Sequence, residues 1–174
     1  MTRRRLERWV RRSALPLLLA LPWVAMRLGD DVNWSRRDFV TWGVMLATAC
    51  GAYEIAARKT GNRAYRAAVG IAVLAAFLLV WINIAVGIIG TETHPANLMF
   101  AGVILVEMMG AVMARFRPEG MARASVVTAV AQACVGLIAA VLRSPEGFVL
   151  SGFFAALWLA SGALFRKAAR QSVL

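Results

Sequence analysis

A carboxyl group in the middle of an apolar stretch is the group in this sequence most able to do chemistry. Glu107 interrupts the otherwise uncharged run 95–114, eight residues before Arg115. If the run is helical, Glu107 would lie about 12 Å along the helix from Arg115, the charged residue at its end. A charge at that depth of a bilayer costs roughly 2.5–3.5 kcal/mol on insertion scales. We therefore expect Glu107 to face other helices, where protonation or a polar partner lowers this cost.

Two polar residues of other apolar runs are expected at the depth of Glu107. Gln132 and Glu107 are almost equally far from Glu119, where the chain is expected to reverse, and Thr48 lies ten residues before Arg58. The three side chains would then form a polar layer near the middle of the membrane. Such a layer is either a proton or ion site or a set of interhelical hydrogen bonds, worth about 0.6–2 kcal/mol each.

A second polar group falls between two apolar runs. Glu92 and His94 carry side chains that bind metals, but two ligands make no complete site. We interpret His94 as a residue at the start of a helix, and we keep an outer-face enzyme site of Glu92, His94 and Asn97 as the alternative. Asn83, nearer the outer end of its run, is expected to hydrogen-bond a neighbouring helix or to contact a ligand.

Six apolar runs are expected to position these residues, and each is interpreted as a transmembrane helix. Ser35-Arg36-Arg37-Asp38 fits a capping box before the second run. The connections are short, so successive helices should be antiparallel neighbours. The expected fold is an all-α integral membrane bundle of six transmembrane helices in one domain, residues 1–174. The runs cover residues 13–28, 39–57, 67–90, 95–114, 124–142 and 147–165.

The composition excludes an ordinary soluble domain. Hydrophobic residues make up 60% of the chain, against about 45–50% in soluble proteins. The net charge of +11 would suggest a nucleic-acid partner in a soluble protein. Here the charges lie at the ends of the apolar runs, which is what membrane insertion requires. We therefore expect a lipid bilayer, and no nucleic acid, as the partner.

The distribution of Lys and Arg predicts the orientation of the chain. The N-terminal arm, the second and fourth connections and the C-terminal tail hold 16 of the 20 Lys and Arg residues, and the other three connections hold four. The positive-inside rule places the richer segments, and thus both termini, in the cytoplasm. The first run lacks a small-residue cleavage site, so we expect an uncleaved first span in a bacterial inner membrane.

Several short strings between residues 30 and 125 point to possible relatives. They are Val32-Asn33-Trp34 with Asp38-Phe39, Tyr53-Glu54, Ala64-Tyr65-Arg66, the string Phe77–Asn83 with Gly87–Gly90, and Pro95–Met99. Together they resemble a family of small polytopic proteins of the bacterial inner membrane. The resemblance implies a small polytopic membrane protein and no particular activity. Glu107 lies outside these strings.

Three function classes fit these observations. The first is a non-enzymatic accessory or assembly component, which would contact other membrane proteins or a second copy of itself. The second is a small transporter or channel subunit that uses Glu107 and Gln132. The third is a membrane enzyme with its site near Glu92 and His94. The sequence has no phosphate-binding loop, nucleophile elbow or metal-ligand cluster, so we expect no cofactor and no metal.

Overall fold

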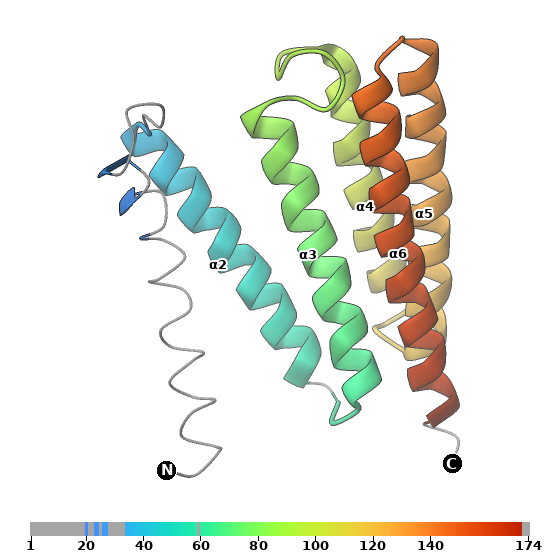
Figure 1. Ribbon diagram of the computed structural model, residues 1–174. Helices are drawn as coiled ribbons and strands as arrows, with labels where there is room; N and C mark the ends of the chain where they lie inside the picture. Colours follow the sequence, from blue (N-terminus) through green and yellow to red (C-terminus); the bar gives the residue numbers. More distant parts are fainter. Residues whose placement is uncertain (1–19, 21–22, 25, 28–33, 59, 172–174) are drawn as a thin grey trace. The chain divides into compact units, whose positions relative to one another are not determined.

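The computed structural model describes residues 20, 23–24, 26–27, 34–58 and 60–171, and every regular element among them is helical (Figure 1). Five of the helices are long and apolar enough to cross a membrane. This confirms the all-α class, whereas the expected first span, 13–28, lies mostly outside the described residues. The helices are α2 (Arg36–Arg58), α3 (Arg63–Ala85), α4 (Leu98–Met113), α5 (Pro118–Val141) and α6 (Pro145–Gln171), with a 3-10 helix, η1 (Pro95–Asn97), before α4.

The chain divides into two compact units, Met1–Gly51 and Ala52–Leu174, so that the boundary falls within α2. In the first unit, α2 begins with the predicted capping box. The backbone N–H of Ser35 donates to the Asp38 carboxylate at 2.7 Å, and the Asp38 N–H donates to the Ser35 hydroxyl at 3.4 Å. The two bonds satisfy donors at the start of the helix, as this motif usually does.

In the second unit, α3 to α6 run alternately up and down (Figure 1). Helix α6 packs along α5 and α3, and α4 packs along α5. At one end, the Asn62 amide donates to Gln171 at 3.2 Å and the Tyr65 hydroxyl donates to the Phe116 carbonyl at 2.9 Å. These bonds join the α2–α3 turn, the α4–α5 turn and the C-terminal end of α6, which together we call the basic end.

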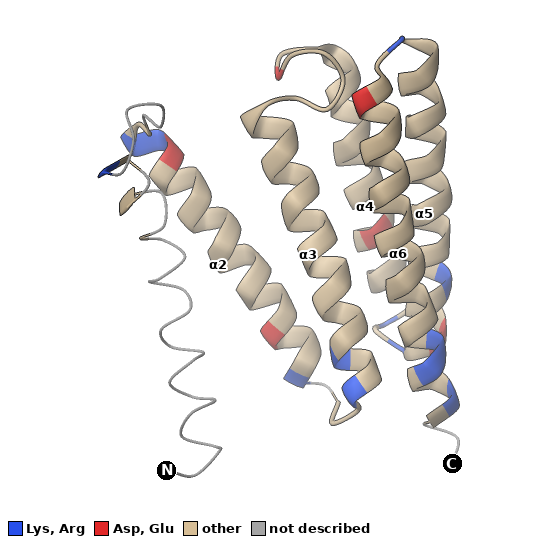
Figure 2. Ribbon diagram, in the orientation of Figure 1, with Lys and Arg blue, Asp and Glu red and all other residues tan. Residues whose placement is uncertain are grey.

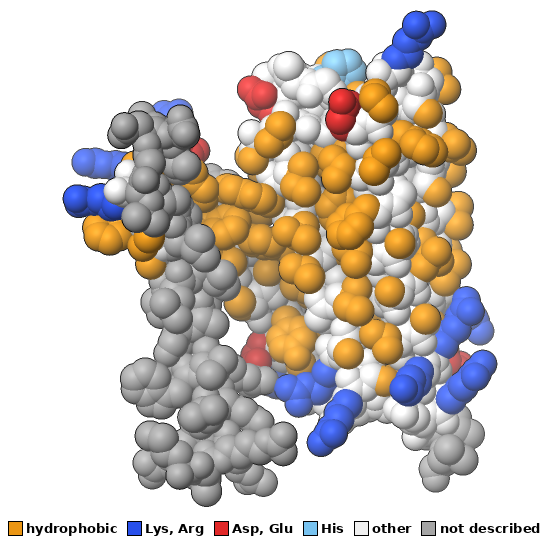
Figure 3. Space-filling model, in the orientation of Figure 1, with side chains coloured by type: hydrophobic (Ala, Val, Ile, Leu, Met, Phe, Trp, Pro, Cys, Tyr) orange, Lys and Arg blue, Asp and Glu red, His pale blue; other side chains and the backbone are white. Residues whose placement is uncertain are grey.

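The described Lys and Arg residues of this unit gather at the basic end (Figure 2). Only Arg143 among them lies elsewhere, in the α5–α6 turn. On the face drawn in Figure 3, apolar side chains cover the middle of the unit and the blue side chains lie mainly at one end. This separation is the one that a lipid bilayer imposes on a helix bundle. The basic residues at the basic end are Arg58, Arg63, Arg66, Arg115, Arg117, Arg123, Arg166, Lys167 and Arg170.

Two buried clusters hold α3 to α6 together. The larger one contains Leu79, Phe100, Phe154 and Trp158, which are almost completely buried. The smaller one lies toward the basic end around Tyr65, whose ring meets Phe165 edge-on with centroids 5.1 Å apart. Large aromatic side chains therefore fill the centre of the unit, where they bury the most apolar surface.

The limits of the helices differ from the limits of the apolar runs. The third run was expected to be one helix through residue 90, but α3 ends at Ala85. Gly87 then adopts φ +79°, and a Cβ there would lie 2.5 Å from the carbonyl carbon of Thr91, so this sharp turn requires glycine. Helix α5, by contrast, begins at Pro118, six residues before its apolar run. In α5, the helical hydrogen bonds therefore extend beyond the apolar run into the polar residues that precede it.

Candidate functional site

The Glu107 side chain lies at the interface between α4 and α5. It is 9% exposed, and its carboxyl group is held by two hydroxyl groups of α5. The Ser125 hydroxyl donates to Oε1 at 3.0 Å, and the Thr128 hydroxyl lies 2.8 Å from Oε2. The expectation that Glu107 faces another helix is therefore confirmed within the second unit.

The Thr128 hydroxyl has a second acceptor besides Glu107. The Thr128 hydroxyl also lies 3.0 Å from the carbonyl oxygen of Ala124, one turn earlier in α5. A hydroxyl carries a single hydrogen, so Thr128 shares that hydrogen between the Glu107 carboxyl group and the Ala124 carbonyl oxygen.

Gln132 is not the hydrogen-bond partner of Glu107. The expected pairing placed the chain reversal at Glu119, but α4 ends at Met113 and α5 begins at Pro118. The reversal thus comes a few residues earlier than expected. This brings Ser125 and Thr128 to the level of Glu107 and places Gln132 one helical turn farther from the basic end.

Gln132 lies among buried polar atoms that have no described partner. Its side chain is fully buried, and neither its amide oxygen nor its amide nitrogen has a hydrogen-bond partner among the described residues. The same holds for the Ser151 hydroxyl and the Trp158 indole N–H of α6, both buried. Unpaired buried groups of this kind each cost about 1–3 kcal/mol. They are therefore the buried polar groups whose hydrogen-bonding capacity the described residues leave unused.

The sequence analysis did not single out the other buried polar side chains near Glu107 and Gln132, although their spacing was visible in the sequence. Ser125, Thr128 and Gln132 are separated by three and four residues, so they share one face of a helix. Ser151 and Trp158 are two turns apart on α6. In the structure these faces meet, since a Cβ on Gly136 would lie 2.8 Å from the Cβ of Ser151. Polar residues that recur at helical spacing within an apolar run are the signal that would have found them.

The other two intramembrane candidates have local partners. Thr48 belongs to the first unit, and its hydroxyl donates to the Val44 carbonyl of its own helix at 2.8 Å. The Asn83 amide nitrogen donates to the Asn97 carbonyl at 3.2 Å. Asn83 therefore connects α3 to the start of α4, the kind of tertiary hydrogen bond expected for it.

The three outer-loop candidates lie in the connection between α3 and α4. Asn97 is buried, and its side chain makes four hydrogen bonds within the loop. Its oxygen accepts from the N–H groups of Ile88 and Ile89 at 3.2 and 2.9 Å, and its nitrogen lies 3.3 and 2.7 Å from the carbonyl oxygens of Ile89 and Thr91. Asn97 thus serves as an internal support of the loop.

His94 has the helix-start role expected for it. Its ring Nδ1 accepts from the Ala96 N–H at 3.2 Å at the start of η1, while the side chain is exposed. Glu92 is also exposed. Among the residues that the structure describes, no three His, Cys, Asp or Glu side chains come together as a metal site would require.

Comparison with known proteins adds no relative: no protein-family model, no curated protein and no solved structure matches this chain. The function therefore has to be argued from the geometry of these residues.

A double-mutant cycle is expected to show that Glu107 and Thr128 interact. Glu107→Leu and Thr128→Val, made singly and together, should give a coupling energy of about 0.6–1.7 kcal/mol, which lies between the mean and the maximum for interhelical hydrogen bonds in membranes. The free energy of unfolding in bicelles with increasing SDS is the measurement. Ser161→Ala replaces Thr128→Val in the control cycle, because the Ser161 hydroxyl donates to the Ala68 carbonyl instead. Equal coupling in the two cycles would contradict the pairing.

Proposed function

We propose that the protein is a multi-pass component of the bacterial inner membrane that works through contacts with other membrane proteins or with a second copy. Its five apolar helices support the membrane environment. The gathering of Lys and Arg at the basic end supports a cytoplasmic position for that end. With the first apolar run as a sixth span, both termini then lie in the cytoplasm.

The observation that carries this proposal is the internal use of the polar side chains. Glu107 binds two hydroxyl groups of α5, Asn97 supports the outer loop and His94 caps η1. The residues best suited to chemistry thus have structural roles in the part of the chain that the structure describes. Away from the basic end, the exposed side chains of α4 and α5 are apolar, a surface suited to lipid or to the helices of a partner.

Photo-crosslinking from this outward surface tests the contact role. The crosslinker would be placed singly at Leu105, Met109, Val130 or Leu137, all of which are exposed. In native membranes we expect a protein adduct of one defined mass from positions on one face and lipid adducts from the others. Lipid adducts alone from all four positions would contradict a function based on contacts.

A transporter or channel subunit is the second candidate, and the buried atoms without partners favour it. Gln132, Ser151 and Trp158 lie in the core of the second unit, one turn or more beyond the carboxyl group of Glu107. Polar groups buried within a bundle often mark the path of a proton or small ion. Since these side-chain atoms make no hydrogen bond among the described residues, they do not help to hold the helices together.

Flux through reconstituted vesicles separates the two candidates. Proteoliposomes with wild-type protein, Glu107→Gln or Gln132→Leu would be loaded with a pH-sensitive dye and given a pH gradient. The contact role predicts that proton flux equals that of protein-free liposomes for all three proteins. Flux in the wild type that falls at least tenfold in Glu107→Gln would instead support the transport role and contradict the first candidate.

A further inference from the structure

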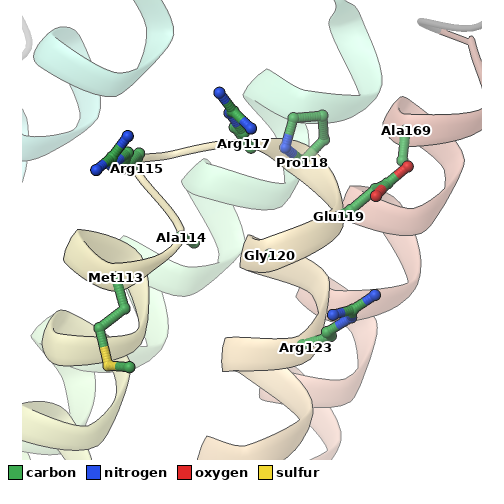
Figure 4. A pocket seen from close by; sticks show the side chains of 9 residues that line it. All are labelled: Met113, Ala114, Arg115, Arg117, Pro118, Glu119, Gly120, Arg123 and Ala169. Carbon is green, nitrogen blue, oxygen red and sulfur yellow. The ribbon is translucent and has the colours of Figure 1, made fainter.

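The α4–α5 turn and the C-terminal part of α6 line an open hollow of about 670 Å³ at the basic end of the second unit. We call it the arginine hollow, because three of its lining residues are arginines. Figure 4 shows Arg115 and Arg117 on the turn itself, Arg123 one turn into α5, and Ala169 of α6 on the opposite side. The lining residues are Met113, Ala114, Arg115, Arg117, Pro118, Glu119, Gly120, Arg123 and Ala169.

The backbone of the turn has a fixed shape. The N–H of Phe116 donates to the Ala111 carbonyl and that of Arg115 donates to the Val112 carbonyl, which is the Schellman pattern at a helix C-terminus. Arg115 (φ 49°) occupies the left-handed position where glycine is usual, and Phe116 (φ 59°) follows it in the same region.

Phe116 anchors this turn to the rest of the unit. Its ring packs against the smaller core cluster, and its carbonyl accepts a hydrogen bond from the buried Tyr65 hydroxyl. The residues on either side of Phe116 are consequently held at the surface. A glycine at position 115 would make the same turn with less strain, so the arginine contributes a charge that the turn itself does not need.

The charges of the hollow have no internal counter-charge. Arg115, Arg117 and Arg123 are exposed, and no described carboxylate lies within ion-pair distance of them, including that of Glu119 in the same lining. Three guanidinium groups against one carboxylate leave a positive excess. Guanidinium groups match the oxygens of a phosphate group in geometry as well as in charge.

We propose that the arginine hollow binds the phosphate group of an anionic lipid headgroup. The hollow lies where an apolar bundle gives way to basic residues, which is the level of the headgroups in a bilayer. Basic pockets between helices at this level are suited to anionic lipids. The proposal relies on the membrane environment of α4 and α5 and is independent of the contact role proposed above.

Binding of short-chain lipids to the detergent-solubilised full-length protein tests this assignment. The probes are dihexanoyl phosphatidylglycerol, dihexanoyl phosphatidylcholine and inorganic phosphate, with Kd measured by thermophoresis. The hollow variant is Arg115→Gln, Arg117→Gln and Arg123→Gln together. The control variant, Arg63→Gln, Arg66→Gln and Arg166→Gln, removes the same charge from the same end but outside the hollow.

We expect the hollow variant to bind phosphatidylglycerol at least about tenfold more weakly than wild type, and the control variant to lose less than about threefold. An equal loss in both variants would overturn the proposal, because it would show attraction to the whole basic end. Equal affinity for the zwitterionic lipid, or tighter binding of free phosphate than of phosphatidylglycerol, would also overturn it. Thermal unfolding of each variant in detergent confirms that it is folded before binding is measured.

Discussion

Replacing Asn97 with alanine is expected to destabilise the protein by about 3 kcal/mol, because two buried backbone N–H groups and two carbonyl groups would lose their partner at once. The donors belong to Ile88 and Ile89, both almost fully buried, where water replaces the lost bonds poorly. The free energy of unfolding in bicelles with increasing SDS measures the change. Limited proteolysis should also cut the variant faster within residues 86–97.

His94→Ala is the matched control for Asn97→Ala in the same loop. His94 makes one exposed hydrogen bond, to the Ala96 N–H, so its removal should cost about 1 kcal/mol or less. If the two variants were equally stable, Asn97 would not be the support of the α3–α4 loop.

Gly110→Leu is expected to lower the free energy of unfolding by about 3 kcal/mol, because α4 and α5 touch at this residue. A Cβ on Gly110 would lie 2.6 Å from the Cβ of Ala124, a distance that real side chains do not adopt. A leucine there must push the two helices apart. The displacement would also disturb the hydrogen bonds of Glu107, which lies one turn away on α4.

Gly102 supplies the control on the same helix. It is exposed, and a Cβ there would meet nothing within 4 Å. Leucine is also a better helix former than glycine by roughly 0.8 kcal/mol, so Gly102→Leu should be neutral or slightly stabilising. Unfolding of both variants in bicelles gives the comparison. Similar stabilities would contradict the close contact of α4 with α5.

The small residues of α4 illustrate how far the sequence could predict the packing. Gly110 and Ala114 are four residues apart, a spacing that fits either a tight bundle or an oligomer. In the structure both face α5, Gly110 against Ala124 and Ala114 against Gly120. Spacing predicts that a face allows close approach, but it does not identify the helix that approaches.

The hydrogen-bond partners of Glu107 could not be predicted, because they depend on the position of the α4–α5 turn, which the residue types do not indicate. The depth of Glu107 and its need for a polar neighbour followed from its place in an apolar run. Its partners, Ser125 and Thr128, follow from the position of the turn, where Arg115 and Phe116 take left-handed backbone conformations. Neither residue type favours that conformation. A shift of a few residues in the turn therefore moved the expected contact by one helical turn.

The role of Asn97 was beyond prediction for a similar reason. An amide near the end of an apolar run suits a ligand site, a helix cap or a loop support. Which role it takes depends on the path of residues 86–91, and that path depends on the left-handed turn at Gly87. The capping box at Ser35 and Asp38 could be predicted, because its hydrogen bonds join residues only three apart.

Site-directed labelling tests most directly whether α3 to α6 cross a lipid bilayer. In a background of Cys50→Ser and Cys134→Ser, single cysteines would be placed in the α2–α3 turn (Gly61→Cys) and in the α3–α4 loop (Thr93→Cys). With a membrane-impermeant maleimide on intact cells, Thr93→Cys should react, and Gly61→Cys should react only after permeabilisation. Equal reaction of both cysteines before permeabilisation, or of neither, would place the two segments on one side and contradict the transmembrane arrangement.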